Sequence, residues 1–308
     1  MRPPIRIYST ERYRALRDVM LEAGGFEAGE VERRTFPDGE HYRRLIGDAD
    51  GRDVVLLGGT VDEADTLEIY DLAYALVHQG AHTLTLMIPW YGYQTMERME
   101  RPGEVVVAKT RAHLLSSIPL AGSGNRVVLM DLHSHGITEY FSGSMRPVHL
   151  SARPLVIEEL GRLGGERFVL GATDAGRAKW VEELANELGV DAAFVFKRRL
   201  SGAKTEVQAL AADVRERRVV IYDDMIRTGG SLLGAARAFL DAGATQVAAV
   251  CTHGVFPADA LERLRASGLL TEIVCTDTHA RVASLDAPGF LRVRSVAGLL
   301  TDFLRGAS

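Results

Sequence analysis

The sequence predicts an α/β protein with mostly parallel sheets. Eight short runs rich in apolar and β-branched residues alternate with longer segments of helical periodicity. Several of these runs have continuously apolar centres, such as 54–57 within 53–59 and 127–130 within 126–131, which is typical of strands buried on both faces of a parallel sheet. Strand and helix recur with a similar rhythm in the two halves of the chain. Two tandem domains, each a mostly parallel sheet flanked by helices, account for this pattern.

Periodicity and helix start and stop signals place the elements. A helix over 62–80 begins with acidic residues and ends at a glycine, as the helix dipole favours. Ser9 and Thr10 are expected to cap an earlier helix, which a glycine pair ends. Further helices are expected over 175–189 and 231–243. The expected strands are 53–59, 83–89, 126–131, 167–172, 192–196, 218–224, 246–251 and 272–276.

The boundary between the two halves is expected near residue 148, in the stretch MRPVHL. No low-complexity linker separates them there. We therefore expect a first domain over 1–147 and a second domain over 148–291. The last helix, within 292–308, is expected to join the first domain.

Composition and charge exclude several classes of function. Apolar residues make up 46% of the chain and charged residues 25%, the balance of a globular protein. A net charge of −5 argues against nucleic acid as the main partner, because a phosphate backbone needs a basic surface. No apolar run approaches the ~20 residues that span a bilayer, and no secretory signal is present, so no membrane is expected. Cys251 and Cys275 are expected to be buried free thiols, as in the cytoplasm.

The stretch VVIYDDMIRTGGS (219–231) carries the clearest functional signal. A buried strand is expected to end at Tyr222, so Asp223 and Asp224 lie at its carboxyl end, where α/β sheets bind ligands. Before the next helix come Arg227, Thr228, Gly229, Gly230 and Ser231. Backbone N–H groups at a helix start bind phosphate, and carboxylates bind sugar hydroxyls directly or through a cation. The stretch therefore fits a phosphorylated pentose; an ordinary turn before a capped helix is the alternative.

This stretch resembles the ribose-phosphate motif of type I phosphoribosyltransferases, and most closely that of ribose-phosphate pyrophosphokinases, the phosphoribosyl pyrophosphate (PRPP) synthetases. Further stretches are similar to motifs of that family in the same order. They are FPDGE (36–40), IPWYGY (88–93), DLHSHGITEYF (131–141), TDAG (173–176), FKRR (196–199) and CTHGVF (251–256). The resemblance covers nearly the whole chain and implies two phosphoribosyltransferase-like domains, the first with a nucleotide loop and the second with a ribose-phosphate loop.

The resemblance also implies roles for single residues. Lys197 and Arg199 would contact the transferring phosphates, where cations stabilise charge that develops on phosphoryl oxygens. The stretch LSGAKTEVQAL that follows would form a mobile lid over the site. His133 and Asp174 match the family's metal contacts, which implies Mg²⁺ as the cofactor.

A nucleotide site for ATP is implied in the first half. The loop with Phe36, Asp38, Gly39 and Glu40 would bind adenine. In the family this loop reaches a neighbouring subunit, so the resemblance implies a homo-oligomer built from dimers, as in the family's hexamers. The second nucleotide segment comprises Thr95, Met96 and Arg98.

Two positions depart from the family pattern. Thr95 and Met96 stand where the family has an arginine and a glutamine that hold ATP, and Gln94 stands where it has a small residue. Arg98 and Arg101 could supply the missing charge. Arg227 stands where the family usually has an aspartate, and a cation there suits a ligand with more negative charge than a phosphomonoester. An Arg227 that points to solvent, or that pairs with an acid, is the alternative.

The sequence leaves four hypotheses. The first is a pyrophosphokinase that converts ATP and ribose 5-phosphate into PRPP and AMP with Mg²⁺. The second is a divergent pyrophosphokinase that uses another acceptor such as ADP-ribose. The third is a non-catalytic regulatory homologue that keeps the fold, against which the retained KRR, DLH and DD stretches speak. A phosphoribosyltransferase that consumes PRPP is the last.

Overall fold

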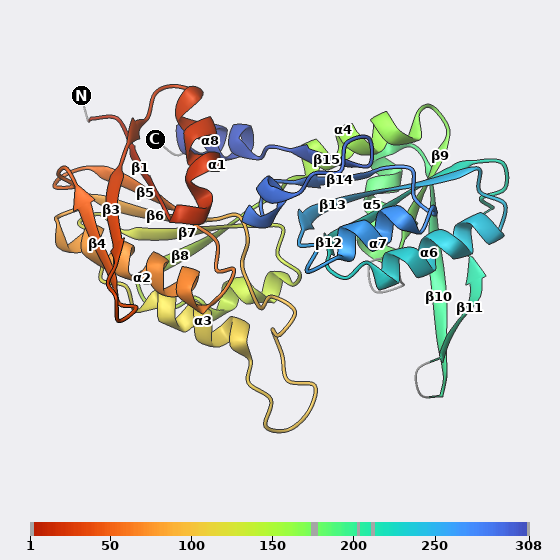
Figure 1. Ribbon diagram of the computed structural model, residues 1–308, viewed down its shortest axis with the longest axis horizontal. Helices are drawn as coiled ribbons and strands as arrows, with labels where there is room; N and C mark the ends of the chain where they lie inside the picture. The colour runs from red at the N-terminus through yellow and green to blue at the C-terminus, as the bar shows by residue number, and fades with distance from the viewer. Residues whose placement is uncertain (1–2, 174–177, 202–203, 211–212, 307–308) are drawn as a thin grey trace. The chain divides into compact units, whose positions relative to one another are not determined.

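The computed structural model describes residues 3–173, 178–201, 204–210 and 213–306. Contacts group the chain into two compact units, each with its own sheet (Figure 1). Unit 1 comprises Met1–Ser151, Thr278–Ala280 and Ser295–Ser308. Unit 2 comprises Ala152–Asp277 and Arg281–Arg294.

Unit 1 is built on a six-stranded sheet in the order β2-β1-β5-β6-β7-β8, in which all neighbours are parallel. Its strands are β1 (Arg6–Ser9), β2 (Glu27–Ala28), β5 (Asp53–Leu57), β6 (Thr83–Ile88), β7 (Asn125–Met130) and β8 (Met145–Leu150). The central strands are apolar on both sides because helices cover both faces. The covering helices are α1 (Arg14–Glu22) and α8 (Ala297–Gly306) on one face, and α2 (Glu63–His78) and α3 (Val107–Ser116) on the other (Figure 1).

A separate antiparallel hairpin of unit 1, β3 (Glu30–Thr35) and β4 (His41–Ile46), stands outside this sheet. Arginines attach it to α2, because Arg33 Nε lies 2.8 Å from Glu68 Oε1 and Arg43 Nη1 lies 3.0 Å from Asp71 Oδ2. Two short 3-10 helices complete the unit, η1 (Glu11–Tyr13) and η2 (His135–Tyr140).

Unit 2 is built on a seven-stranded sheet in the order β11-β10-β9-β12-β13-β14-β15, parallel except for the β10–β11 pair. Its strands are β9 (Phe168–Ala172), β10 (Asp191–Ser201), β11 (Lys204–Leu210), β12 (Arg218–Ile226), β13 (Gln246–Gly254), β14 (Ile273–Thr276) and β15 (Leu291–Arg294). Its helices are α4 (Arg153–Gly164), α5 (Ala178–Leu188), α6 (Gly230–Asp241), α7 (Ala260–Ala266) and the 3-10 helix η4 (Ala280–Ser284).

Alternate side chains of the unit 2 sheet enter two separate apolar clusters. Val220 and Tyr222 of β12 pack with residues of α4 and α5, and the Tyr222 ring stacks on Trp180 at 4.6 Å. Val219 and Ile221 pack with residues of α6 and α7. Strand β12 is therefore held from both sides, which fixes the position of the residues at its carboxyl end.

Both cysteines are buried free thiols, as expected. Cys251 on β13 is 1% exposed and Cys275 on β14 is fully buried. Burial raises the pKa of Cys251 well above its usual value and that of Cys275 to about 12, so neither is a reactive thiolate at neutral pH.

The α/β class and the parallel sheets are confirmed, and the expected central strands are present, but several details differ. Strand β12 continues to Ile226, two residues beyond the expected range 218–224 and four beyond Tyr222, because it keeps pairing with β13 as far as Gly254. The expected cap by Thr10 is wrong. Its hydroxyl is buried without a hydrogen-bond partner among the described residues, and a 3-10 turn precedes α1.

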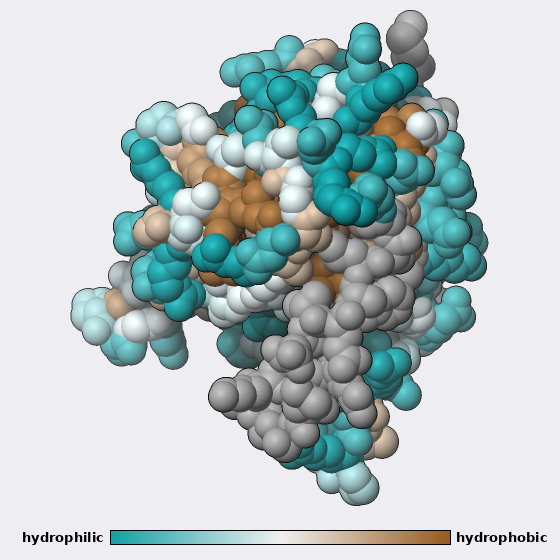
Figure 2. Space-filling model, turned by 90° about the vertical axis from the view of Figure 1, so that its right-hand side faces the viewer, coloured by the Kyte–Doolittle hydropathy of each residue, from teal (hydrophilic) through white to brown (hydrophobic). Residues whose placement is uncertain are grey.

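Polar residues form most of the surface of unit 2 seen in Figure 2, around a hydrophobic area. Among the described residues, no helix is both long enough and apolar enough to cross a membrane.

Candidate active site

The two adjacent aspartates lie near the carboxyl end of β12, in the middle of the unit 2 sheet. Successive strand residues point to opposite faces, so the carboxylates of Asp223 and Asp224 diverge. Asp223 is half-buried and accepts a hydrogen bond from the Thr173 hydroxyl at 3.0 Å. Asp224 is 5% exposed and accepts from the N–H of Met225 at 2.9 Å. Asp223 is therefore the more accessible carboxylate of the pair.

The loop after β12 leads directly into α6. Gly229 has φ +79°, and a Cβ on it would lie 2.6 Å from Leu264 Cδ2, so this position needs glycine for both conformation and space. A Cβ on Gly230 would meet no described atom within 4 Å. Thr228, Gly230 and Ser231 are exposed. The loop therefore presents small residues and an accessible helix start.

The first turn of α6 has no anion of its own. No side chain caps it, and none of its first residues is acidic. The first N–H groups of an α-helix have no partner within the helix, and the helix dipole adds partial positive charge there. Such a helix start can bind a phosphate through its backbone.

Arg227 begins this loop and is exposed. It makes no ion pair with an acidic side chain of the described residues, so the pairing alternative finds no support among them. Its charge adds to the positive potential of the loop.

The DLHSH segment follows β7 at the carboxyl end of the unit 1 sheet. Its residue His133 is half-buried. The N–H of His133 donates to Gln94 Oε1 at 2.7 Å, and the Gln94 side chain is 1% exposed. The Gln94 Nε2 atom is buried without a hydrogen-bond partner among the described residues. Gln94 therefore ties the loop after β6 to the loop that carries His133.

The loop after β6 is shaped by its close contact with the loop after β5. A Cβ on Gly92 would lie 1.9 Å from the Thr60 carbonyl oxygen, so only glycine fits. The N–H of Gly92 donates to the Thr60 hydroxyl at 2.7 Å. Tyr93 follows with φ +60° and hydrogen-bonds to Glu63, which keeps the pKa of Glu63 below its usual value. The Arg111 guanidinium lies over the Tyr93 ring, 5.4 Å from its centroid.

The proposed nucleotide residues of this loop point to solvent. Thr95 is exposed, Met96 is 46% exposed, and the Arg98 side chain is 74% exposed. The nearest acid to Arg98 is Glu97, at 3.9 Å. These side chains are therefore available to a ligand.

The FPDGE stretch forms the turn of the β3–β4 hairpin. The Phe36 N–H donates to the Glu40 carbonyl at 2.8 Å, and Gly39 takes φ +93°. Asp38 Oδ1 accepts from the Glu40 N–H at 3.1 Å. All five residues of the turn are exposed, and the Phe36 ring touches Tyr42 only at an edge. The turn thus presents an aromatic face and two acids to whatever lies in front of it.

Of three further expected site residues, the structure describes only the backbone of two and nothing of the third. Asp174 lies outside the described residues. Lys197 and Arg199 lie in β10, which pairs with β11 over Lys204–Leu210, but their side chains also lie outside the description. The stretch expected to form a mobile lid thus includes β11, which pairs antiparallel with β10 in a hairpin.

No group of three or more His, Cys, Asp or Glu side chains in the described ranges could hold a metal ion by itself. Taken separately, the carboxylates of Asp223 and Asp224 in unit 2 and the imidazole of His133 in unit 1 are groups that can bind a Mg²⁺ ion that arrives with a nucleotide. Such ions use one or two protein ligands and complete their shell with phosphates and water.

The sequence did not predict the hydrogen bonds by which Gln94 and Thr173 hold His133 and Asp223. Gln94 was visible as a departure from the family pattern, and Thr173 begins one of its motifs. Their hydrogen bonds join segments 39 and 50 residues apart, and no local pattern encodes such a pairing.

The parallel sheets and the glycine-containing loop that precedes α6 are typical of the phosphoribosyltransferase fold. The pattern described as "Phosphoribosyl transferase domain" matches residues 156–268, and that described as "N-terminal domain of ribose phosphate pyrophosphokinase" matches residues 5–118. The chain belongs to the ribose-phosphate pyrophosphokinase family.

Relatives and a solved structure support this membership. A ribose-phosphate pyrophosphokinase of Fusobacterium nucleatum is 34% identical, over 90% of this chain and 86% of its own. That of Synechococcus elongatus is 32% identical, over 97% and 89%. The crystal structure of phosphoribosylpyrophosphate synthetase from Mycobacterium smegmatis matches with a TM-score of 0.87 and 26% identity, over 99% of both chains.

Proposed function

We propose that the chain transfers a pyrophosphoryl group from ATP to the anomeric hydroxyl of ribose 5-phosphate, with PRPP and AMP as products. The observation that carries the proposal is the uncapped start of α6, with an open glycine loop and two aspartates before it. This arrangement binds a phosphate and a polyol next to each other. Family membership adds the nucleotide as the second substrate.

Unit 2 binds the acceptor in this proposal. The backbone N–H groups from Thr228 to Ser231 hold the 5-phosphate, and the hydroxyls of Thr228 and Ser231 add donors. The accessible carboxylate of Asp223 accepts from ribose hydroxyls, and Asp224 supports the turn of the backbone. Arg227 attracts the dianion and shields it from the two acids.

Unit 1 binds ATP. Phe36 stacks on the adenine of the ATP held by a neighbouring subunit, and the acids Asp38 and Glu40 accept from its amino group. Arg98 supplies charge to the phosphates in place of the arginine that the family has where this chain has Thr95. Mg²⁺ would be held by His133 and Asp174 together with the nucleotide, and when bound it neutralises phosphate charge. Gln94 holds the His133 segment in position for this role.

The reaction is a displacement at the β-phosphorus of ATP. The anomeric oxygen forms a new bond to that phosphorus, the bond to the α-phosphate oxygen breaks, and AMP leaves while the hydroxyl proton passes to solvent. Negative charge develops on the bridging and nonbridging oxygens. Lys197 and Arg199 stabilise it, Arg199 through two parallel hydrogen bonds and Lys197 as a point charge.

Release of AMP with ribose 5-phosphate as acceptor tests the proposal. Purified protein with ATP and Mg²⁺ should form AMP and PRPP in equal amounts, and only when the pentose phosphate is present. Lys197→Ala should lower kcat by roughly 10²- to 10³-fold, the usual effect of removing one transition-state contact. The exposed Lys179→Ala is the matched control and should keep full activity. Absence of AMP with every pentose phosphate would reject the proposed reaction.

Arg227 favours one second candidate, a pyrophosphokinase whose acceptor carries a diphosphate, such as ADP-ribose. An exposed arginine without an acidic partner among the described residues suits additional negative charge on the ligand. Initial rates of AMP release with each acceptor separate the two candidates. A preference of more than about tenfold in kcat/KM, about 1.4 kcal/mol, for ribose 5-phosphate would reject the second.

A homo-oligomer and a cytoplasmic location belong to the proposal as well. The exposed FPDGE turn stands at the end of a hairpin outside the sheet, which suits a contact with a neighbouring subunit. Two buried free thiols suit a reducing compartment. Sedimentation equilibrium would measure the oligomer, and a monomer at assay concentration would contradict it.

A further inference from the structure

A cation, an aromatic ring and an acid meet at the carboxyl edge of the unit 1 sheet. Arg111 belongs to the second turn of α3, Tyr93 to the loop after β6, and Glu63 to the first turn of α2. Helices α2 and α3 cover the same face of the sheet (Figure 1). Each helix follows a parallel strand, so its first turns lie at the edge where α/β sheets bind ligands.

Glu63 binds both of the other side chains. The Tyr93 hydroxyl donates to Glu63 Oε1, and Arg111 Nη2 donates to the same oxygen at 3.2 Å. The guanidinium also lies over the Tyr93 ring, 5.4 Å from its centroid. The close fit of Gly92 against Thr60 and the φ of +60° at Tyr93 fix the backbone that carries this ring. The guanidinium of Arg111 is therefore oriented before any ligand binds.

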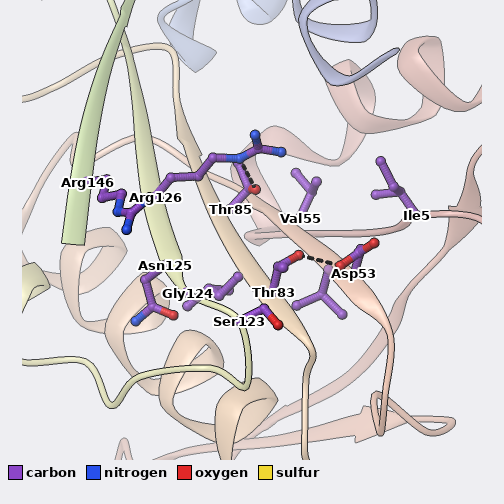
Figure 3. A pocket seen from close by; sticks show the side chains of 12 residues that line it. Ile5, Asp53, Val55, Thr83, Thr85, Ser123, Gly124, Asn125, Arg126 and Arg146 are labelled. Carbon is purple, nitrogen blue, oxygen red and sulfur yellow. Dashed lines mark hydrogen bonds between the residues drawn. The ribbon is translucent and has the colours of Figure 1, made fainter. Parts of the chain in front are cut away.

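The hydrogen-bonding capacity of Arg111 is only partly used. A guanidinium has five N–H donors, and in the described part of the chain Glu63 is the only acid that pairs with this one. Its Nε atom is buried without an acceptor among the described residues. By contrast, Arg126 at the amino edge of the same sheet donates from Nε to Thr85 Oγ1 at 2.7 Å (Figure 3). Buried donors are normally paired, so Arg111 retains donors for an anionic ligand.

The loop beside Arg111 also holds the expected metal residue. Gln94 of this loop accepts a hydrogen bond from the N–H of His133 at 2.7 Å. Residues 89–96 contain no lysine or arginine. The side chain of Arg98, the next cation along the chain, is 74% exposed, whereas that of Arg111 is 23% exposed. Arg111 is thus the more restrained of the two cations near this loop.

We propose that Arg111 binds the phosphates of the nucleotide in unit 1, and that Glu63 pairs with its guanidinium when the nucleotide is absent. The planar guanidinium binds two phosphate oxygens at once, which makes Arg111 a specificity-determining residue for a polyphosphate. The side chain of Glu63 is 67% exposed, so the ligand can displace its carboxylate into solvent. This inference rests on the proposed function, which assigns ATP to unit 1.

Calorimetric titration with ATP and Mg²⁺, in the absence of ribose 5-phosphate, tests the role of Arg111. Arg111→Gln should raise the Kd for ATP by about tenfold, the effect of losing one charge-assisted contact. Arg215→Gln is the matched control, because it removes an equal charge from an exposed arginine of unit 2 that is also paired with an acid. It should bind ATP as the parent does. An unchanged Kd in Arg111→Gln would overturn the proposal.

Glu63→Gln separates phosphate binding from a purely structural contact. Because Glu63 competes with the ligand for the guanidinium, this variant should lower the Kd for ATP by about two- to fivefold, the strength of an exposed ion pair. In an Arg111→Gln background the same substitution should have no effect. A structural contact predicts instead that both single variants weaken ATP binding, and that result would overturn the proposal.

The two variants also separate this inference from the proposed function. Glu63 is exposed, so Glu63→Gln decides even if substitution of Arg111 prevents folding. A parent that binds ATP, with a Kd that neither variant changes, would overturn the inference and leave the proposed function standing. A parent that binds no ATP would overturn both.

Discussion

The starts of α2 in unit 1 and α6 in unit 2 occupy the same place in their units, yet they are opposite in charge. Each helix follows a loop after a buried central strand, β5 or β12. The start of α2 is capped by Asp62 Oδ1, which accepts from the Asp65 N–H at 2.9 Å, and its first turn contains Glu63 and Asp65. The start of α6 has neither a side-chain cap nor an acid.

The space near the start of α2 is filled by a side chain, whereas the space beside Gly230 at the start of α6 is open. A Cβ on Gly59, in the loop before α2, would lie 2.2 Å from the Tyr13 hydroxyl, so the protein's own side chain fills that space. A Cβ on Gly230 would meet no described atom within 4 Å. The comparison teaches that a helix start becomes a phosphate site when the chain leaves its N–H groups without an internal anion.

Placing an acid at the start of α6 should give the largest effect, because it would make this helix resemble α2. In Ser231→Asp, repulsion of the dianion should raise the KM for ribose 5-phosphate by about 10- to 100-fold. The free energy of unfolding should stay the same or rise by about 0.5 kcal/mol, because a negative charge at a helix N-terminus interacts favourably with the helix dipole. Steady-state kinetics and denaturant unfolding measure both. Ser231→Asn is the neutral control, and an equal loss in that variant would show that charge is not the cause.

Removing the cap of α2 should affect stability and leave the substrate site intact. Asp62→Ala should lower the free energy of unfolding by about 1 kcal/mol, because the Asp65 N–H loses its partner. The KM for ribose 5-phosphate should stay the same. Urea unfolding and the AMP assay measure the two quantities. A large rise in KM without loss of stability would show that α2, and not α6, starts at the phosphate site.

The acids at α2 also predict a pH dependence of stability. Burial raises the pKa of Asp65 to about 6, opposed by Arg12, whose Nε lies 3.3 Å from Asp65 Oδ1. The folded protein therefore holds this proton more tightly than the unfolded chain, and the stability contribution falls as the pH rises from about 4 to about 6. Relative to the parent, the free energy of unfolding of Asp65→Asn should rise by about 2 kcal/mol between pH 4 and pH 7. A difference between the two proteins that is constant with pH would contradict this.

The exposed cation of the α6 loop should give the smallest effect. Arg227→Ala should raise the KM for ribose 5-phosphate by about two- to fivefold, since an exposed charge contributes roughly 0.5–1 kcal/mol. The difference in KM between parent and variant should be smaller in 0.5 M salt than in 0.1 M salt. The Debye length at 0.5 M is about half its value at 0.1 M, so the charge of Arg227 is more strongly screened. Initial rates at the two salt concentrations measure it. A difference that persists in high salt would indicate direct recognition of the acceptor by Arg227.

The sequence was sufficient for the class of fold and for the position of the phosphate loop. Continuous apolar runs such as 219–222 predict buried parallel strands, and the glycines and hydroxyls that follow them are local features. Strands without a strong apolar run escaped prediction. Strand β8 contains Pro147 and β3 is mostly charged, so tertiary pairing rather than propensity defines them.

The site could be predicted only in its local parts. Residues from Thr228 to Ser231 are contiguous and form one short loop, so the sequence alone predicts it. The tie between Gln94 and His133 and the hydrogen bond from Thr173 to Asp223 depend on contacts between segments that are far apart in the sequence. Such contacts have no signature in a single sequence, because any of many polar residues can serve as partner.

A crystal structure of the protein with ribose 5-phosphate tests the central claim most directly. The account predicts the 5-phosphate at the start of α6, within about 3 Å of the backbone N–H groups from Thr228 to Ser231, with a ribose hydroxyl on Asp223. A sugar phosphate bound elsewhere on the protein, with this loop empty, would contradict the assignment of the acceptor site to unit 2.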